Sequence, residues 1–171
     1  MSQDAFGDLI KRGDAEGVRR ALTADASLAN RPIRWRLNQQ NESGPLHYVS
    51  DCVGHGWLTD ANADPLAKLL ITNGAKIDGD GRRETPLIGS VSLGAESVSR
   101  ILIAEGAKLE ATSVFGARAL HWAAWMGAAT TVQLLLARGA EIEARCSEFG
   151  ATPLFWAVHG YGPDGPKPKT D

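Results

Sequence analysis

Apolar residues recur at near-helical spacing through most of the chain, most clearly between residues 120 and 137. The run 131–137 carries one apolar face, made of Val132, Leu134, Leu135 and Leu136. A second helical run covers 120–125, and a short Met-Gly-Ala segment separates the two. This stretch therefore predicts two short helices joined by a tight turn.

A short motif with leucine after proline or alanine appears at the start of four such segments. Its copies are Gly44-Pro45-Leu46-His47, Thr85-Pro86-Leu87-Ile88, Ala119-Leu120-His121-Trp122 and Thr152-Pro153-Leu154-Phe155. Leu87 and Leu120 lie 33 positions apart, and Leu120 and Leu154 lie 34 apart. A period of this length is typical of a stack of small units and not of one central core.

A second landmark keeps the same frame. Glycine–alanine pairs occur at Gly74-Ala75, Gly106-Ala107 and Gly139-Ala140. Leu87 to Gly106 and Leu120 to Gly139 both span 19 positions. The glycine suits a helix C-terminus, because glycine enters the left-handed region without strain. Thr85 and Thr152, each followed by proline, suit the N-cap and first position of a helix.

The chain resembles the ankyrin repeat family, whose first helix opens with a T-P-L-H-x-A pattern. The nearest copies here are residues 119–124 and 152–157, while Gly44 stands where the family has threonine. The resemblance implies an all-α solenoid of stacked helix-turn-helix units joined by β-hairpin loops. It covers residues 1–171 as a single domain, with units at about 2–30 (an N-terminal cap), 40–78, 81–110, 114–144 and 148–171 (incomplete).

Composition narrows the function classes. The 171 residues carry a net charge of −2, unlike the basic balance of most nucleic-acid-binding proteins, so we expect no nucleic-acid partner. No apolar run approaches the length of a membrane span, and no signal peptide is visible. The two cysteines, Cys52 and Cys146, fall in different units, which favours a reduced, cytoplasmic setting. We expect a monomer.

The connection after the first unit is long. Ile33, Trp35 and Leu37 alternate with Arg34 and Arg36, a period of two that predicts a β-hairpin finger. Two interpretations stay open for it. Either Trp35 packs back on the first unit while the arginines are solvated, or Arg34 and Trp35 form a protruding contact element.

The second unit has about nine extra residues between its helices, within 54–64. Insertions of this kind map to loops on one face of a stack. Asp64-Pro65 looks like a new N-cap and first helical residue. Trp57 either closes the loop onto the body or offers a contact.

The last unit ends in a run rich in glycine and proline, 160–171, which cannot form a second helix. Either the chain is a fragment of a longer array or the half-unit caps it. We expect this tail to be mobile.

The resemblance implies that partners bind at the hairpin tips and on the inward side of the first helices. At those places the C-terminal half is apolar, and aromatic and methionine side chains there are typical of protein-binding surfaces. We predict partner contacts from Phe115, Trp125, Met126, Phe149, His159, Arg34, Trp35 and Arg82. For the first five, the alternative is that some of them turn inward as core; packing is the better interpretation for Trp122 and Trp156.

No constellation points to catalysis. The resemblance implies a structural role for His47 and His121, whose rings would bond neighbouring hairpin backbone. Cys52 and His55 are only a pair, whereas zinc sites usually need four ligands, so we expect no metal and no cofactor. No serine, cysteine or carboxylate stands near His159 in the pattern of a catalytic nucleophile and its base.

The sequence therefore favours a non-catalytic module that binds a protein or peptide on its concave face. The alternatives are a regulatory or accessory part of a larger protein or enzyme, and small-ligand binding in the Trp/His cluster.

Overall fold

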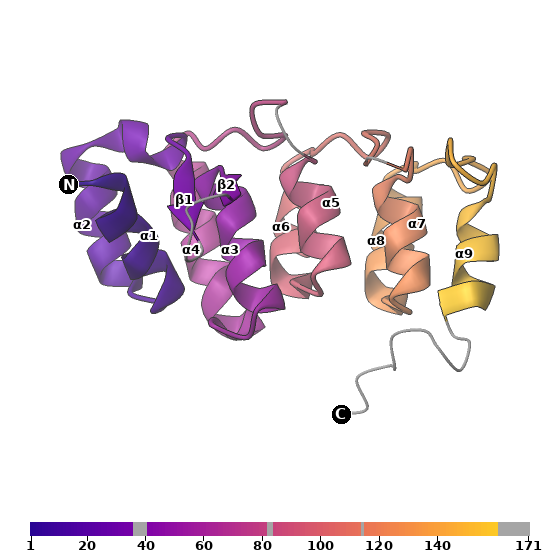
Figure 1. Ribbon diagram of the computed structural model, residues 1–171, viewed down its shortest axis with the longest axis horizontal. Coiled ribbons are helices and arrows are strands. Elements are labelled where there is room, and N and C mark those ends of the chain that lie inside the picture. The colour runs from indigo at the N-terminus through magenta and orange to yellow at the C-terminus, as the bar shows by residue number, and fades with distance from the viewer. Residues whose placement is uncertain (36–40, 82–83, 114, 161–171) are drawn as a thin grey trace.

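The computed structural model describes residues 1–35, 41–81, 84–113 and 115–160. Short helices stand side by side in a row, with the longer loops between units along one edge and the short turns within units along the other (Figure 1). The helices are α1 (Gln3–Lys11), α2 (Ala15–Ala24), α3 (Pro45–Gly54), α4 (Asp60–Thr72), α5 (Pro86–Ser92), α6 (Glu96–Ala104), α7 (Ala119–Trp125), α8 (Ala129–Ala137) and α9 (Pro153–Gly160), with a 3₁₀ turn η1 (Ala26–Ala29) after α2. The predicted all-α solenoid is confirmed.

Helix boundaries follow the local signals in the sequence. Thr85 Oγ1 accepts the Ile88 N–H at the start of α5, and proline opens α3, α5 and α9. The second helices α4, α6 and α8 are each followed by a glycine with positive φ, namely Gly74, Gly106 and Gly139. The predicted helix ends at these three glycines are confirmed.

The helix α4 starts earlier than predicted. Its N-cap is Thr59, whose hydroxyl accepts the Asn62 N–H, and Pro65 lies inside the helix. The prediction of a new start at Asp64-Pro65 was therefore wrong. The Asp60 carboxylate holds the first turn in place, because it accepts the Ser97 N–H of α6 at 3.1 and 3.0 Å.

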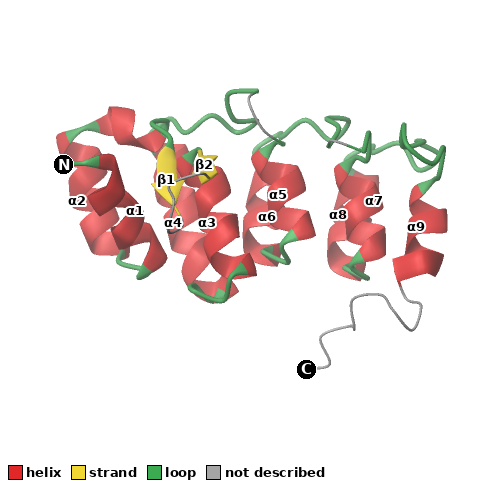
Figure 2. Cartoon of the chain, viewed as in Figure 1, coloured by secondary structure: helices red, strands yellow, loops and turns green. Residues whose placement is uncertain are grey.

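The finger is a two-stranded hairpin, β1 (Ile33–Trp35) and β2 (Asn41–Ser43), paired antiparallel with Ile33 opposite Ser43 (Figure 2). Ile33 and Trp35 are buried and Arg34 is exposed, as the period of two requires. Arg36 and Leu37 lie outside the described residues. The hairpin packs on α1 and α3, so its described part lies against the body.

One continuous core joins the units. It runs from Phe6 and Ile10 in α1, through Leu66 and Leu102 in the second helices, to Leu135 in α8. A smaller cluster forms around Trp156 of α9 and the loops before α7 and α9, and two side chains of α7 pack against it. Each unit buries its apolar side only against its neighbours, which is the arrangement that stabilises a stack. Gly160 of the predicted tail ends α9, and the rest of the tail, 161–171, lies outside the described residues.

Candidate functional site

Four aromatic rings lie in a connected row across α7 and α9. We name Phe115, Trp122, Trp125 and Trp156 the aromatic patch. Ring centroids are 6.5 Å apart for Phe115 and Trp122, 5.3 Å for Trp122 and Trp156, and 5.8 Å for Trp125 and Trp156. Trp122 and Trp125 lie one helical turn apart on α7 and so share a face. Trp156 of α9 contacts both, edge to face, a preferred aromatic geometry.

The patch is accessible to different degrees along its length. Phe115 exposes 40% of its surface, Trp122 and Trp125 are half-buried, and Trp156 is buried at the base. The packing predicted for Trp156 is confirmed, and Trp122 also packs against the core, although it is only half-buried. Rings that are fixed on one side and exposed on the other suit recognition, because they lose little freedom on binding.

The loops that carry Phe115 and Phe149 are tied together. The Phe115 carbonyl accepts N–H bonds from Ser147 at 3.1 Å and Glu148 at 3.3 Å. Gly116 has a φ of +66°, and a Cβ there would lie 2.3 Å from Ser147 Oγ, so the close approach needs glycine. Phe149, in the same turn, exposes 69% of its surface. The structure thus brings the two predicted tip residues into adjacent loops.

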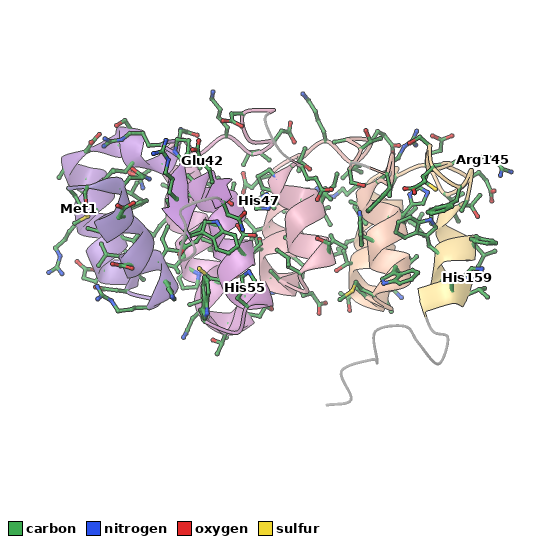
Figure 3. All side chains as sticks on the ribbon, viewed as in Figure 1. Met1, Glu42, His47, His55, Arg145 and His159 are labelled. Atoms are coloured by element: carbon green, nitrogen blue, oxygen red, sulfur yellow. The ribbon has the colours of Figure 1, made fainter. Side chains whose placement is uncertain are left out.

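The other predicted C-terminal residues, Met126 and His159, are not part of the row of rings. Met126 caps α7 and is half-buried. His159 is exposed in the last turn of α9, and its ring lies 4.3 Å from Phe155. Figure 3 shows His159 at the end of the row opposite to Met1. No ring contact joins His159 to the aromatic patch among the described residues.

The predicted N-terminal contact residues fall in different places. Trp35 is buried, and its Nε1 donates to Ser43 Oγ at 3.2 Å, which in turn donates to Asp51 Oδ2 at 2.7 Å. The ring is therefore part of the body, which favours the packing interpretation. Arg34 is exposed, with its Nε 3.3 Å from Glu42 Oε2. Arg82 lies outside the described residues.

The loop between α3 and α4 closes onto the first unit. The rings of His55 and Trp57 stack at 4.8 Å, and Trp57 meets Trp35 edge to face at 5.8 Å. The Lys11 Nζ lies 3.9 Å from the centre of the Trp57 ring, a cation–π contact. These contacts favour the interpretation that Trp57 holds the insertion on the body.

Sequence reasoning missed a hollow beside the hairpin. A cavity of about 300 Å³ lies between β2, the start of α3 and the loop before α5, and Glu42, His47, Lys76, Asp80 and Glu84 line part of it. Glu42 and His47 lie in the same unit in Figure 3. The residues that line the cavity come from segments far apart in the sequence, so no local sequence pattern could predict the cavity.

Two titratable groups inside the stack, His121 and Cys52, are held in their uncharged forms. His121 Nδ1 accepts the Arg118 N–H at 3.2 Å, which leaves Nε2 to donate to the Ala151 carbonyl at 3.1 Å. His121 thus bonds backbone in the next hairpin loop, the structural role that the resemblance implies. Burial lowers its pKa and raises the pKa of Cys52 to about 12. A neutral imidazole and a protonated thiol follow at neutral pH.

The described part of the chain contains neither a metal-binding cluster nor a membrane-spanning helix. No three His, Cys, Asp or Glu side chains there gather closely enough to hold a metal ion. No helix among these residues combines the length and the apolar character that crossing a bilayer requires.

Comparison with models of protein families gives a match. A family model described as ankyrin repeats in three copies matches residues 56–146, more than half of the chain. A search of curated proteins finds no match.

Proposed function

Because the chain belongs to the ankyrin repeat family, whose members are generally protein–protein interaction modules, we propose that it is a non-catalytic binding module. It binds a protein or peptide segment on the side of the stack formed by the first helices. The aromatic patch and the neighbouring Phe149 loop supply the main contacts. The proposal includes a cytoplasmic location and a monomeric chain.

The observation that carries this proposal is the row of rings across α7 and α9. Aromatic side chains supply much of the binding energy at protein interfaces, especially where they are already fixed. Trp156 fixes Trp122 and Trp125 from one side, and Ser147 and Glu148 fix the Phe115 loop. A partner therefore meets a surface that is ordered before it binds.

Selection of random peptides displayed on phage against the purified chain tests this proposal. We expect peptides whose affinity falls about fivefold or more in Phe149→Ser and in Trp125→Ala, a loss of about 1 kcal/mol at each contact. Phe149 has an exposed ring, so Phe149→Ser should leave the melting temperature unchanged.

Val158→Asp is the matched control, because Val158 is also apolar and exposed but lies on the outer side of α9. It should leave the affinity of these peptides unchanged. The proposal fails if no peptide is enriched, or if every enriched peptide binds the Phe149 and Trp125 variants as well as the unmodified chain.

A further inference from the structure

Three pairs in which asparagine or aspartate directly precedes glycine lie in the segment between α4 and α5. They are Asn73-Gly74, Asp78-Gly79 and Asp80-Gly81. Such pairs are chemically reactive, because the glycine nitrogen can attack the carbonyl carbon of the preceding side chain with no Cβ in the way. The surroundings of the three pairs differ in whether they oppose this attack.

The Asn73-Gly74 pair is held at both of its reacting groups. Asn73 Nδ2 donates to the Leu69 carbonyl at 2.8 Å, and the Gly74 N–H donates to the Ile71 carbonyl at 2.9 Å. Both groups therefore point toward carbonyls of the last turn of α4. The two hydrogen bonds must open before Asn73 Cγ and the Gly74 nitrogen can meet.

The Asp78-Gly79 pair is held in the same way. Asp78 Oδ1 accepts the Lys108 N–H at 2.8 Å, and the Gly79 N–H donates to the Lys76 carbonyl at 3.0 Å. The turn is also packed, since a Cβ at Gly79 would lie 3.4 Å from Pro86 Cδ. We name Asn73-Gly74 and Asp78-Gly79 the locked pairs.

The Asp80-Gly81 pair differs at the attacking nitrogen. The Gly81 N–H meets no acceptor among the described residues. Gly81 has a φ of +79°, and nothing lies within 4 Å of the place where its Cβ would be. Both residues of the pair are exposed, so water can reach them. No hydrogen bond of the nitrogen has to open before it reacts.

We propose that Asp80-Gly81 is a modification site, at which the peptide bond moves from the α-carbonyl to the side-chain carbonyl of Asp80. The Gly81 nitrogen forms a bond to Cγ of the protonated carboxyl group, whose hydroxyl leaves with the amide proton as water. This step closes a succinimide ring. A second water then adds at the α-carbonyl carbon and breaks its bond to nitrogen. The product is isoaspartate, which carries the α-carboxylate as a side group.

The product alters the loop between the second and third units. The main chain becomes one carbon longer at position 80, while the net charge stays the same. Gly79 and Asp80 both line the cavity beside the hairpin, so the change falls at the edge of that cavity. The site is separate from the aromatic patch and does not depend on the function proposed for that patch.

Ageing of the purified folded chain at physiological temperature and pH, followed by peptide mapping, tests this proposal. Electron-transfer fragmentation distinguishes isoaspartate from aspartate at each position, and methyl transfer by an isoaspartate O-methyltransferase gives a second readout. We expect isoaspartate at position 80 to form at least about tenfold faster than isoaspartate at 78 or deamidation at 73, because each locked pair must first break two hydrogen bonds. Mapping also keeps the signal apart from Asp164-Gly165, which lies outside the described residues.

The same chain unfolded in guanidinium chloride is the matched control. Without the locking hydrogen bonds, Asn73-Gly74 should react fastest of the three pairs, because an amide carbon is a better electrophile than that of a carboxylate. The order of reactivity should therefore reverse on unfolding. In the folded chain, Asp80→Glu should remove the methyl label from the peptide that contains position 80, since attack by the Gly81 nitrogen would then require a six-membered ring.

Two results would overturn the proposal. The first is reaction of a locked pair as fast as Asp80-Gly81 in the folded chain. The second is no isoaspartate at position 80 of the folded chain after a time in which the unfolded chain has formed it there. Neither measurement reports on the aromatic patch, so the function proposed for the patch stands or fails separately.

Discussion

The two ends of the stack carry similar apolar residues but present opposite surfaces. The first unit buries Phe6, Ile10, Val18 and Leu22 and turns charged side chains outward. The last unit buries Trp156 on one side of α9 and exposes three large apolar side chains on the other. In a stack, the neighbour decides whether a motif residue is core or surface, because each unit is too small to bury its own apolar side.

The largest expected difference in the free energy of unfolding is between substitutions of two phenylalanines, one at each end of the stack. Phe6→Ala should lower the free energy of unfolding by about 3–5 kcal/mol, because the buried ring of α1 leaves a cavity. Phe155→Ala should change it by about 1 kcal/mol or less, since half of that ring already faces water. Urea unfolding followed by circular dichroism gives both values. Equal losses would contradict the distinction between the ends.

A smaller effect is expected at a joint between interior units. Asp60 of α4 accepts the Ser97 N–H and so caps α6 of the next unit. Asp60→Ala should lower the free energy of unfolding by about 1–2 kcal/mol, as the loss of an N-cap usually does. Asp64→Ala is the control on the same helix, because Asp64 makes only a surface ion pair with Lys68 among the contacts described. It should cost less than about 0.5 kcal/mol in the same urea experiment.

Two glutamates stand at the same position of successive units and form a matched pair: Glu110, four residues after Gly106, and Glu143, four residues after Gly139. Glu110 accepts the Glu141 N–H and pairs with Arg118, so Glu110→Ala should cost about 1 kcal/mol of stability. Glu143 is exposed, and Glu143→Ala should cost almost nothing. Thermal melts of both variants provide the comparison. A clear loss in the Glu143 variant would mean that this carboxylate already has a structural partner.

The smallest expected effect concerns pH. Burial holds the pKa of His121 below its ordinary value, so the unfolded chain takes up a proton first as the pH falls below about 6.5. The contribution of neutral His121 is complete above that pH and is lost progressively on acidification. His121→Gln should therefore flatten the decline of stability between about pH 7 and pH 5, measured by urea unfolding at each pH. If stability falls with pH equally steeply in the variant and in the unmodified chain, His121 is not the source of the decline.

Local signals predicted most of the fold. The leucine motif and the glycine–alanine pairs placed α5 to α9 in register, because capping and helix termination depend on neighbouring residues. The start of α4 was missed because Asp64-Pro65 offers a second local cap signal, whereas Thr59 caps the helix. The cavity beside Glu42 was missed because its lining comes from segments far apart in the sequence.

The candidate sites were predicted only in part. Aromatic composition pointed to Phe115, Trp125 and Phe149, but it did not reveal that Trp156 packs edge to face against both indoles of α7. Trp35 belongs to a run in which apolar and charged residues alternate, as in a half-buried strand. This alternation alone does not decide whether the side with Trp35 faces the core or solvent. Its burial depends on α3 and on the loop that carries His55 and Trp57.

The sequence by itself determined the repeat, its period and its helix ends, because a periodic pattern and a cap are short-range properties of a chain. The tertiary structure alone decided which equivalent residues are covered. Leu87 and Leu154 share one motif position, and only the presence of neighbouring helices makes the first a core residue and the second an exposed one. Burial is a property of the space between units, and no single unit encodes what lies beside it.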